Sequence, residues 1–204
     1  MTMYTPYLFD LLGTLMFAIS GALAASEKQI NKDLFSVTFI GFITALGGGS
    51  LRDIMLGRYP LIWIRDINYI LVIALGVTLA ILFRVILHRY RKVLFLFDTI
   101  GIGFYTIVGT QLALSMQVNP LAASLLGLFS AVFGGVIRDT LLNDIPLIFR
   151  KEVYATACLA GAFLFVGLRW LQVPDGINYY VSAGLIIGIR LLSVKRKWQL
   201  PEMI

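Results

Sequence analysis

The sequence predicts an all-α integral membrane protein with seven transmembrane helices: a 3+3 inverted-topology repeat followed by a seventh helix. Three observations predict this class: an apolar composition, seven apolar stretches of spanning length, and one duplicated element. The 204 residues are 59% hydrophobic and 14% charged, whereas soluble domains are about 45–50% apolar and about 25% charged. The mean hydropathy is +0.87. This balance exceeds what a buried core needs, so we expect a single membrane domain over residues 1–204.

The individual spans follow from the apolar runs, because a membrane-crossing helix needs about 20 mainly apolar residues. Short gaps containing Pro, Asn, Asp, Lys and Arg separate these runs and leave no room for a soluble domain. The predicted spans are Pro6–Ala25, Leu34–Leu56, Ile67–Leu87, Leu94–Met116, Leu121–Leu142, Val153–Leu171 and Ile177–Ser193.

The distribution of positive residues predicts the orientation, because Lys and Arg accumulate in cytoplasmic loops. Of the 17 Lys and Arg, twelve fall on the side of the C-terminus, three on the other side and two within spans. The twelve are Lys28, Lys32, Arg84, Arg89, Arg91, Lys92, Arg150, Lys151, Arg190, Lys195, Arg196 and Lys197; the three are Arg58, Arg65 and Arg169. We expect a multi-pass protein of the inner (plasma) membrane, with its N-terminus outside and its C-terminus in the cytoplasm.

A long internal repeat is the most informative feature. Residues 41–62, GFITALGGGSLRDIMLGRYPLI, align with residues 127–148, GLFSAVFGGVIRDTLLNDIPLI, at an offset of 86, with ten of 22 positions identical. The first span matches the fourth at an offset of 88, where the Phe-Asp of residues 9–10 recurs at residues 97–98. Repeats of this length indicate a duplicated structural unit.

Each repeat unit contains three spans, so the second unit must enter the membrane the other way up. Repeat 1 covers residues 6–87 and repeat 2 covers residues 94–171, with span 7 at residues 177–193 outside both. Inverted repeats of this kind are common in proteins that move solutes, and their sites lie near the bilayer midplane on interrupted helices.

Spans 2 and 5 carry the recurring Gly-Gly-x-x-Arg-Asp element. Glycine costs about 1 kcal/mol relative to alanine in a helix interior, so adjacent glycines predict a kink whose released carbonyls suit a desolvated cation. Close helix packing is the compatible alternative for small residues in lipid. We expect the passage to be lined by the glycines and by nearby hydroxyl groups, namely Gly47, Gly48, Gly49, Gly134, Gly135, Thr44, Ser50 and Ser130.

The Arg-Asp pairs in the same spans, Arg52-Asp53 and Arg138-Asp139, are costly to place in a membrane. Neighbouring residues point about 100° apart on a helix, so we expect no pairing within each dipeptide. Pairing across the repeats and pairing with the carboxylates of Asp10 and Asp98 both remain open, as do a purely structural clamp and snorkelling to the interface. A role in gating or permeation is the functional interpretation.

Composition excludes several other classes. One cysteine and one histidine exclude a disulfide framework and a multi-residue Cys or His metal site. No P-loop and no nucleophile with a base is present, so we expect neither an enzyme nor a cofactor other than a permeant monovalent cation. The net charge of +6 fits membrane lipids as partners rather than nucleic acid.

With seven spans, a 3+3 inverted repeat and a paired Gly-Gly-x-x-Arg-Asp element, the chain resembles prokaryotic members of the TRIC family, the trimeric intracellular cation channels. It is also similar to the bacterial membrane proteins grouped as glycine transporters. The resemblance implies a homotrimer in which each subunit has its own pore for monovalent cations, chiefly K⁺, between kinked helices 2 and 5. It places Arg52, Asp53, Arg138 and Asp139 at or beside that pore. Animal members carry a lysine in helix 5, and span 5 here has none.

Three functions remain open from the sequence. A passive channel for K⁺ and Na⁺ is the leading interpretation, because the hydroxyls and glycine carbonyls suit small cations. A transporter of glycine or another small solute needs the same broken helices. A membrane assembly protein that transports nothing is the third.

Overall fold

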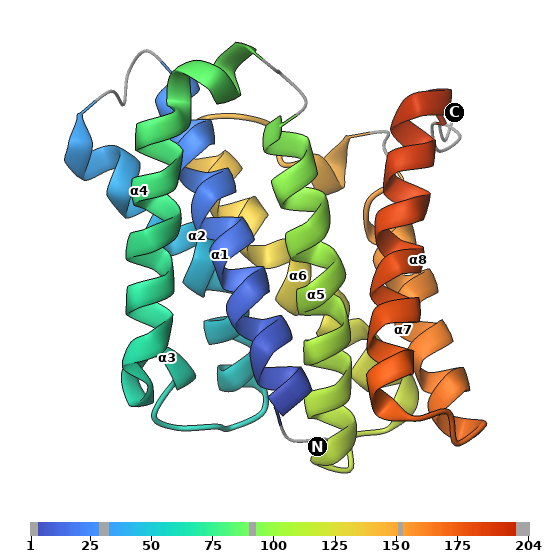
Figure 1. Cartoon of the computed structure of the whole chain (residues 1–204). Coiled ribbons are helices and arrows are strands. Elements are labelled where there is room, and N and C mark those ends of the chain that lie inside the picture. Colours follow the sequence, from blue (N-terminus) through green and yellow to red (C-terminus); the bar gives the residue numbers. More distant parts are fainter. Residues whose placement is uncertain (1–3, 29–32, 90–92, 151–152, 199–204) are drawn as a thin grey trace.

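The computed structural model describes residues 4–28, 33–89, 93–150 and 153–198, and Figure 1 shows them as a bundle of helices. The described residues form eight α-helices and one short 3-10 helix. In chain order these are α1 (Tyr4–Glu27), α2 (Leu34–Met55), α3 (Ile62–Arg65), α4 (Ile67–Arg89), α5 (Val93–Ser115), α6 (Pro120–Leu141), η1 (Leu147–Phe149), α7 (Ala155–Trp170) and α8 (Asp175–Arg196).

Each of the seven predicted spans coincides with one long helix, and the ends agree to within three residues. Among the described residues, five of these helices are long and apolar enough to cross a membrane, namely α1, α2, α5, α6 and α8. The described apolar parts of α4 and α7, Ile67–Phe83 and Ala155–Trp170, are shorter. An all-helical, multi-pass membrane protein is therefore confirmed, whereas the count of seven spans stays a prediction.

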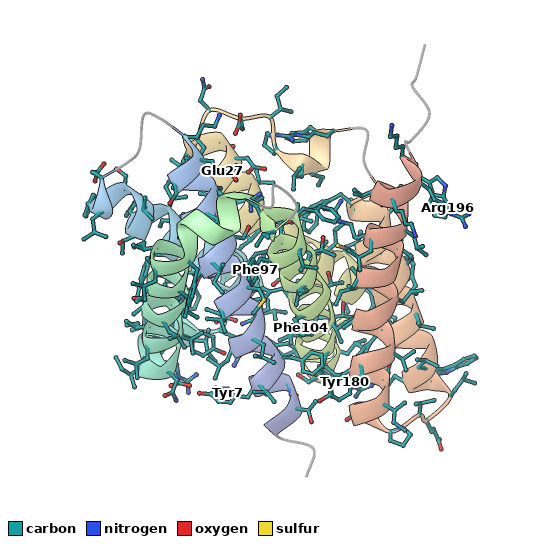
Figure 2. The ribbon with its side chains drawn as sticks, turned by 45° about the horizontal axis from the view of Figure 1, so that its top comes forward. Tyr7, Glu27, Phe97, Phe104, Tyr180 and Arg196 are labelled. Atoms are coloured by element: carbon teal, nitrogen blue, oxygen red, sulfur yellow. The ribbon has the colours of Figure 1, made fainter. Side chains whose placement is uncertain are left out.

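Helices α1, α2, α5 and α6 form the centre of the bundle. Helix α1 packs against α2, α4 and α5, while α6 packs against α2, α5 and α7. Helices α7 and α8 pack together and against α5 at one side. Figure 1 shows that α1 and α5 run in opposite directions, as do α2 and α6. Glu27 and Arg196, near the ends of α1 and α8, lie at one end of the bundle, and Tyr7 lies at the other (Figure 2).

Helices α2 and α6 begin in the same way. The side chain of Asp33 accepts a hydrogen bond from the Ser36 amide at 2.9 Å, and that of Asn119 accepts one from the Ala122 amide at the same distance. These caps satisfy amide groups that have no partner in the first turn. The two capping residues are 86 positions apart, which is the offset of the repeated element.

The kinks predicted in α2 and α6 are not confirmed. Both helices continue without interruption through their glycines, Gly47 to Gly49 and Gly134 to Gly135. The helical ladder is therefore intact there, and no carbonyls are released by a break. The packing of Gly48 and Gly134, described below, explains why alanine is not used at these two positions.

Arg190, counted among the positive residues on the C-terminal side, lies inside a helix rather than in a loop. Helix α8 extends to Arg196, so Arg190 lies more than one turn inside it and is 0% exposed. Its guanidinium carbon lies 4.7 Å from the ring centroid of Phe95 and 4.6 Å from that of Tyr154. Such stacking suits a delocalised guanidinium in a desolvated setting.

Candidate functional site

Helices α2 and α6 cross with their backbones in direct contact. A Cβ atom added at Gly48 would overlap the carbonyl oxygen of Ser130, and one added at Gly134 would overlap the carbonyl oxygen of Thr44. The contact is reciprocal, because Gly48 corresponds to Gly134 and Thr44 to Ser130 at the repeat offset of 86. The packing interpretation of the glycines is therefore confirmed at this crossing, where only glycine lets the helices approach so closely.

Hydroxyl groups accompany the crossing on both helices. Thr44 is 0% exposed and donates its hydroxyl to the carbonyl of Ile40 at 2.6 Å. Ser130 is 1% exposed, and its Oγ has no hydrogen-bond partner among the described residues. A buried polar atom without a partner is unfavourable and calls for an explanation. Only the two carbonyls face the opposite helix at the crossing, since the Thr44 hydroxyl lies against Gly21 on α1 and that of Ser130 against Gly109 on α5.

Arg52 lies near the end of α2 in a buried ion-pair network. Its two terminal nitrogens donate to the two carboxylate oxygens of Asp10, each at 3.2 Å, and its Nε donates to Asp53 at 3.1 Å. All three side chains are at most 6% exposed. This two-point geometry is the strong form of an arginine–carboxylate pair.

Other groups complete this first network. The Tyr69 hydroxyl donates to Asp10 at 2.9 Å, and the backbone amide of Ile62 donates to Asp53 at 3.0 Å. Arg58, which is 28% exposed, approaches Asp53 at 3.5 Å. The network therefore joins α1 and α2 to the start of α4 and the turn before α3.

Arg138 forms the corresponding network near the end of α6. Its NH1 donates to Asp98 at 2.9 Å and to the hydroxyl of Ser20 at 2.7 Å, while its Nε donates to Asp139 at 2.8 Å. The Leu147 amide donates to the other oxygen of Asp139 at 3.2 Å. Because α2 and α6 run in opposite directions (Figure 1), the two networks lie towards opposite ends of the bundle.

The networks decide between the pairings left open by the sequence. The pairing of Arg52 with Asp10 and of Arg138 with Asp98 is confirmed, and each arginine keeps its partner within its own repeat. The expectation of no pairing within each Arg-Asp dipeptide is wrong, because the long arginine side chain folds back to its neighbour. Both arginines are 1% exposed, which excludes snorkelling.

Three candidate residues lie beside the crossing rather than in it. Ser50 accepts a hydrogen bond from the indole Nε1 of Trp63 at 3.2 Å, in an apolar groove of about 270 Å³ between α2 and α6. A Cβ at Gly49 would contact the ring of Tyr105 at 3.6 Å. One at Gly135 would lie 3.4 Å from the Tyr154 hydroxyl.

A polar cavity of about 170 Å³ gives access to the Arg138 network. Its lining includes Arg138, Asp139 and Arg150. Lys28 and Asp144 also line it, and they form an ion pair of 2.7 Å between the end of α1 and the turn after α6. The cavity connects the second network with the surface at that end of the bundle.

The Lys28–Asp144 pair is expected to contribute little to stability, because its side chains are 36% and 40% exposed. Exposed pairs typically contribute about 0.2–1 kcal/mol. We expect Lys28→Gln, Asp144→Asn and the double variant to unfold within about 1 kcal/mol of the wild type, as measured in a double-mutant cycle in detergent. A coupling energy well above that range would mean that the pair is more buried in solution than in this structure.

Asp66 lies between α3 and α4, outside the spanning segments, and its hydrogen bonds join α1 to the start of α4. The Tyr7 hydroxyl donates to Asp66 at 2.6 Å, and the Asn68 amide donates to the other carboxylate oxygen at 2.9 Å. The hydrogen bond from Tyr7, followed by that from the Asn68 amide, lowers the pKa of Asp66 because both stabilise the charged form, although desolvation opposes them. This carboxylate stays ionised at neutral pH and fixes the start of α4.

Sequence reasoning missed the aromatic and hydroxyl groups that complete the site. Tyr69, Ser20, Thr14 and Tyr105 all contribute hydrogen bonds to the networks or to α2. One signal was available for Tyr105, because comparison of the repeats at offset 88 places it opposite Phe17. Among the described residues, no group of three or more His, Cys, Asp or Glu is placed to hold a metal ion.

The fold and the paired, buried arginines define a multi-pass membrane protein with charged groups inside its bundle. A family model described as "Glycine transporter" matches residues 7–85 and 95–170 of the chain. The chain therefore belongs to that family.

Several known proteins resemble the chain over nearly its whole length. The "UPF0126 membrane protein" of Deinococcus radiodurans is 38% identical, with 95% of this chain and 92% of that protein covered. The "UPF0126 inner membrane protein YadS" of Escherichia coli K12 is 33% identical, with 96% and 94% covered.

Two solved structures are also similar. The TRIC trimeric intracellular cation channel orthologue from Rhodobacter sphaeroides has a TM-score of 0.85 and 30% identity, with 95% of this chain and 98% of that chain covered. A prokaryotic TRIC channel crystallised in 0.5 M KCl has a TM-score of 0.88 and 31% identity, with 97% and 100% covered. The resemblance to TRIC channels is therefore confirmed. These neighbours are channels and not enzymes, which confirms the expectation that the chain is not an enzyme.

Proposed function

We propose that the chain is a passive channel for monovalent cations, K⁺ and Na⁺, with a pore in each subunit between α2 and α6. The observation that carries the proposal is the reciprocal crossing of these helices, where Gly48 faces the Ser130 carbonyl and Gly134 faces the Thr44 carbonyl. Backbone carbonyl oxygens replace the hydration shell of small cations in selective pores. The TRIC structures that share this fold support the same function.

Passage of a cation requires the crossing to open, because the two backbones are in contact there. We therefore propose that this structure represents a closed arrangement and that α2 and α6 separate in the conducting one. Arg52 and Arg138 present no unbalanced positive charge to a cation, since each is paired with two carboxylates. The permeant ion is the only small molecule that the proposal requires.

An inverted-topology repeat underlies the proposed pore. Its support comes from the two segments matched by the family model, from matching helix caps and from the two arginine networks. We propose that repeat 1 (residues 6–87) and repeat 2 (residues 94–171) face each other across α2 and α6, with the seventh span outside both. Seven spans would place the N-terminus outside and the basic C-terminus in the cytoplasm of an inner membrane, in keeping with the description of the Escherichia coli relative.

A homotrimer in the lipid bilayer is part of the same proposal. The Rhodobacter sphaeroides channel, which is similar over 95% of this chain, is a trimeric intracellular cation channel orthologue. Light scattering of the purified protein in detergent is expected to give three subunits per particle. A monomer in several mild detergents and in nanodiscs would contradict this part of the proposal.

Transport of glycine or a related small solute is the second candidate, and the family description favours it. Purified protein in liposomes separates the two functions. With an outward K⁺ gradient, we expect K⁺ release that increases in proportion to the gradient and is unaffected by glycine. Saturable uptake of labelled glycine without K⁺ release would instead support the transporter, and empty liposomes prepared in parallel give the background leak.

A further inference from the structure

Tyr105 reaches from α5 into the glycine segment of α2. Its hydroxyl lies 3.0 Å from the carbonyl oxygen of Ala45 and 2.8 Å from the hydroxyl of Thr14 on α1. The side chain is 1% exposed, and its ring lies against Gly48 and Gly49. Tyr105 thus contacts α2 within one turn of its crossing with α6.

The second copy of this arrangement lacks the hydroxyl groups. At the repeat offset of 88, Phe17 corresponds to Tyr105 and Ile102 to Thr14. The two rings pack against each other with their centroids 5.1 Å apart. Phe17 lies against Gly101 as Tyr105 lies against Gly13, so the ring packing is reciprocal. Ring packing alone therefore accounts for an aromatic residue at both positions, but not for the hydroxyl on one side.

The hydroxyl protons around Tyr105 are too few for the contacts. Thr14 Oγ1 also lies 2.8 Å from the carbonyl oxygen of Asp10, so Tyr105 and Thr14 make three short oxygen–oxygen contacts. Each hydroxyl has one proton, and a carbonyl cannot donate. Two arrangements place a proton in the contact between the two hydroxyls: Tyr105 donates to Ala45 while Thr14 donates to Tyr105, or Tyr105 donates to Thr14 while Thr14 donates to Asp10. If each hydroxyl donated to its carbonyl instead, two oxygens would lie 2.8 Å apart with no proton between them, which is unfavourable. Of the two favoured arrangements, only the first gives the Ala45 carbonyl the tyrosine as a partner.

We infer that Tyr105 and Thr14 form a two-position hydrogen-bond switch that holds α2 in one position and releases it in the other. The inference rests on the proposed function, because it assigns these two positioning residues to the opening of the crossing. In the holding position, the Tyr105 hydroxyl ties the Ala45 carbonyl to α5, and α2 stays against α6. In the releasing position, that bond is absent and the segment with Gly48 is free to move away from Ser130.

The two positions make the switch testable by opposite effects of two conservative variants. Tyr105→Phe removes the holding bond, so single-channel open probability is expected to rise roughly fivefold, which corresponds to a typical buried hydrogen bond. Thr14→Val removes the acceptor and donor needed for release, so open probability is expected to fall by roughly twofold or more as one arrangement is lost. Unitary conductance is expected to stay unchanged in both.

A residue with a merely structural role would give effects of one sign, because either variant would loosen the bundle. The matched control is Tyr179→Phe, which removes the hydroxyl of a tyrosine that is 1% exposed and whose hydroxyl has no hydrogen-bond partner among the described residues. This control is expected to leave open probability unchanged. If Tyr105→Phe and Thr14→Val changed the open probability in the same direction, or if neither changed it, the switch would be overturned.

Hydrogen–deuterium exchange of full-length protein in nanodiscs gives a readout that needs no ion flux. Peptides covering residues 45–52 are expected to exchange faster in Tyr105→Phe and slower in Thr14→Val than in the wild type. If the wild type conducts no ions but exchange follows this pattern, the channel proposal fails and the switch stands. If exchange accelerates in both variants, the switch fails whatever the currents show. Should Tyr105→Phe not fold, Thr14→Val decides alone, because only the switch predicts slower exchange.

Discussion

Gly48→Ala is expected to destabilise the protein by about 1–3 kcal/mol or more, the range for overpacking a close-packed site. The added methyl group would overlap the carbonyl oxygen of Ser130, and both groups belong to helix backbones that cannot rotate away. Helices α2 and α6 would have to separate along their whole contact. The thermal unfolding midpoint in detergent, followed by circular dichroism, measures the loss.

Gly184→Ala and Gly188→Ala in α8 are the matched controls. A Cβ at either position meets nothing within 4 Å, and alanine is favoured over glycine in a helix by about 1 kcal/mol. Both controls are expected to unfold at or above the wild-type midpoint. If Gly48→Ala were as stable as these controls, the direct contact between α2 and α6 would be wrong.

Arg52→Met is expected to have the second large effect, a loss of about 3–5 kcal/mol, as for other buried ion pairs that lose one partner. Asp10 is 4% exposed and would keep a buried charge without its cation. Asp10→Asn alone would also destabilise the protein, because it weakens a two-point ion pair. Chemical unfolding of both single variants and of the double variant measures these effects.

The double variant shows whether Asp10→Asn raises or lowers stability once Arg52 has been replaced. Once Arg52 is replaced, Asp10→Asn removes an uncompensated charge and is expected to restore part of the lost stability. The same substitution in the wild-type background lowers stability. Additive losses in the two backgrounds would contradict the pairing, since residues in one network should show coupling. Asp144→Asn, which changes a carboxylate that is 40% exposed and in a pair expected to contribute little, serves as the control for the loss of one negative charge.

The helices could be predicted closely from the sequence, because hydrocarbon imposes one length and one composition on every span. The ends of α2 show further signals of the same kind, since Asp33 is a typical N-cap and Gly57 and Arg58 follow shortly after Met55. The short helix α3 could not be predicted in the same way, because four residues carry no periodic pattern. The presence of Arg52 and Arg138 within spans already indicated buried, paired charges.

The details of the site depended on tertiary geometry. The glycines of α2 and α6 suit both a kink and close packing, and only the neighbouring carbonyls distinguish the two. The pairing of Arg138 with Asp139 depends on how the arginine side chain folds back, which residue spacing along a helix does not give. Tyr105 was missed because its partners, Thr14 and Ala45, are 91 and 60 residues away.

The reversal potential of the purified protein in a planar bilayer tests the central claim most directly. Under a tenfold KCl gradient, a passive pore that excludes chloride is expected to reverse near the K⁺ equilibrium potential, about 59 mV for a singly charged ion. Addition of glycine to either side should leave both the current and its reversal unchanged. A reversal near zero, or no current at any voltage from protein that is folded by circular dichroism, would contradict a cation channel.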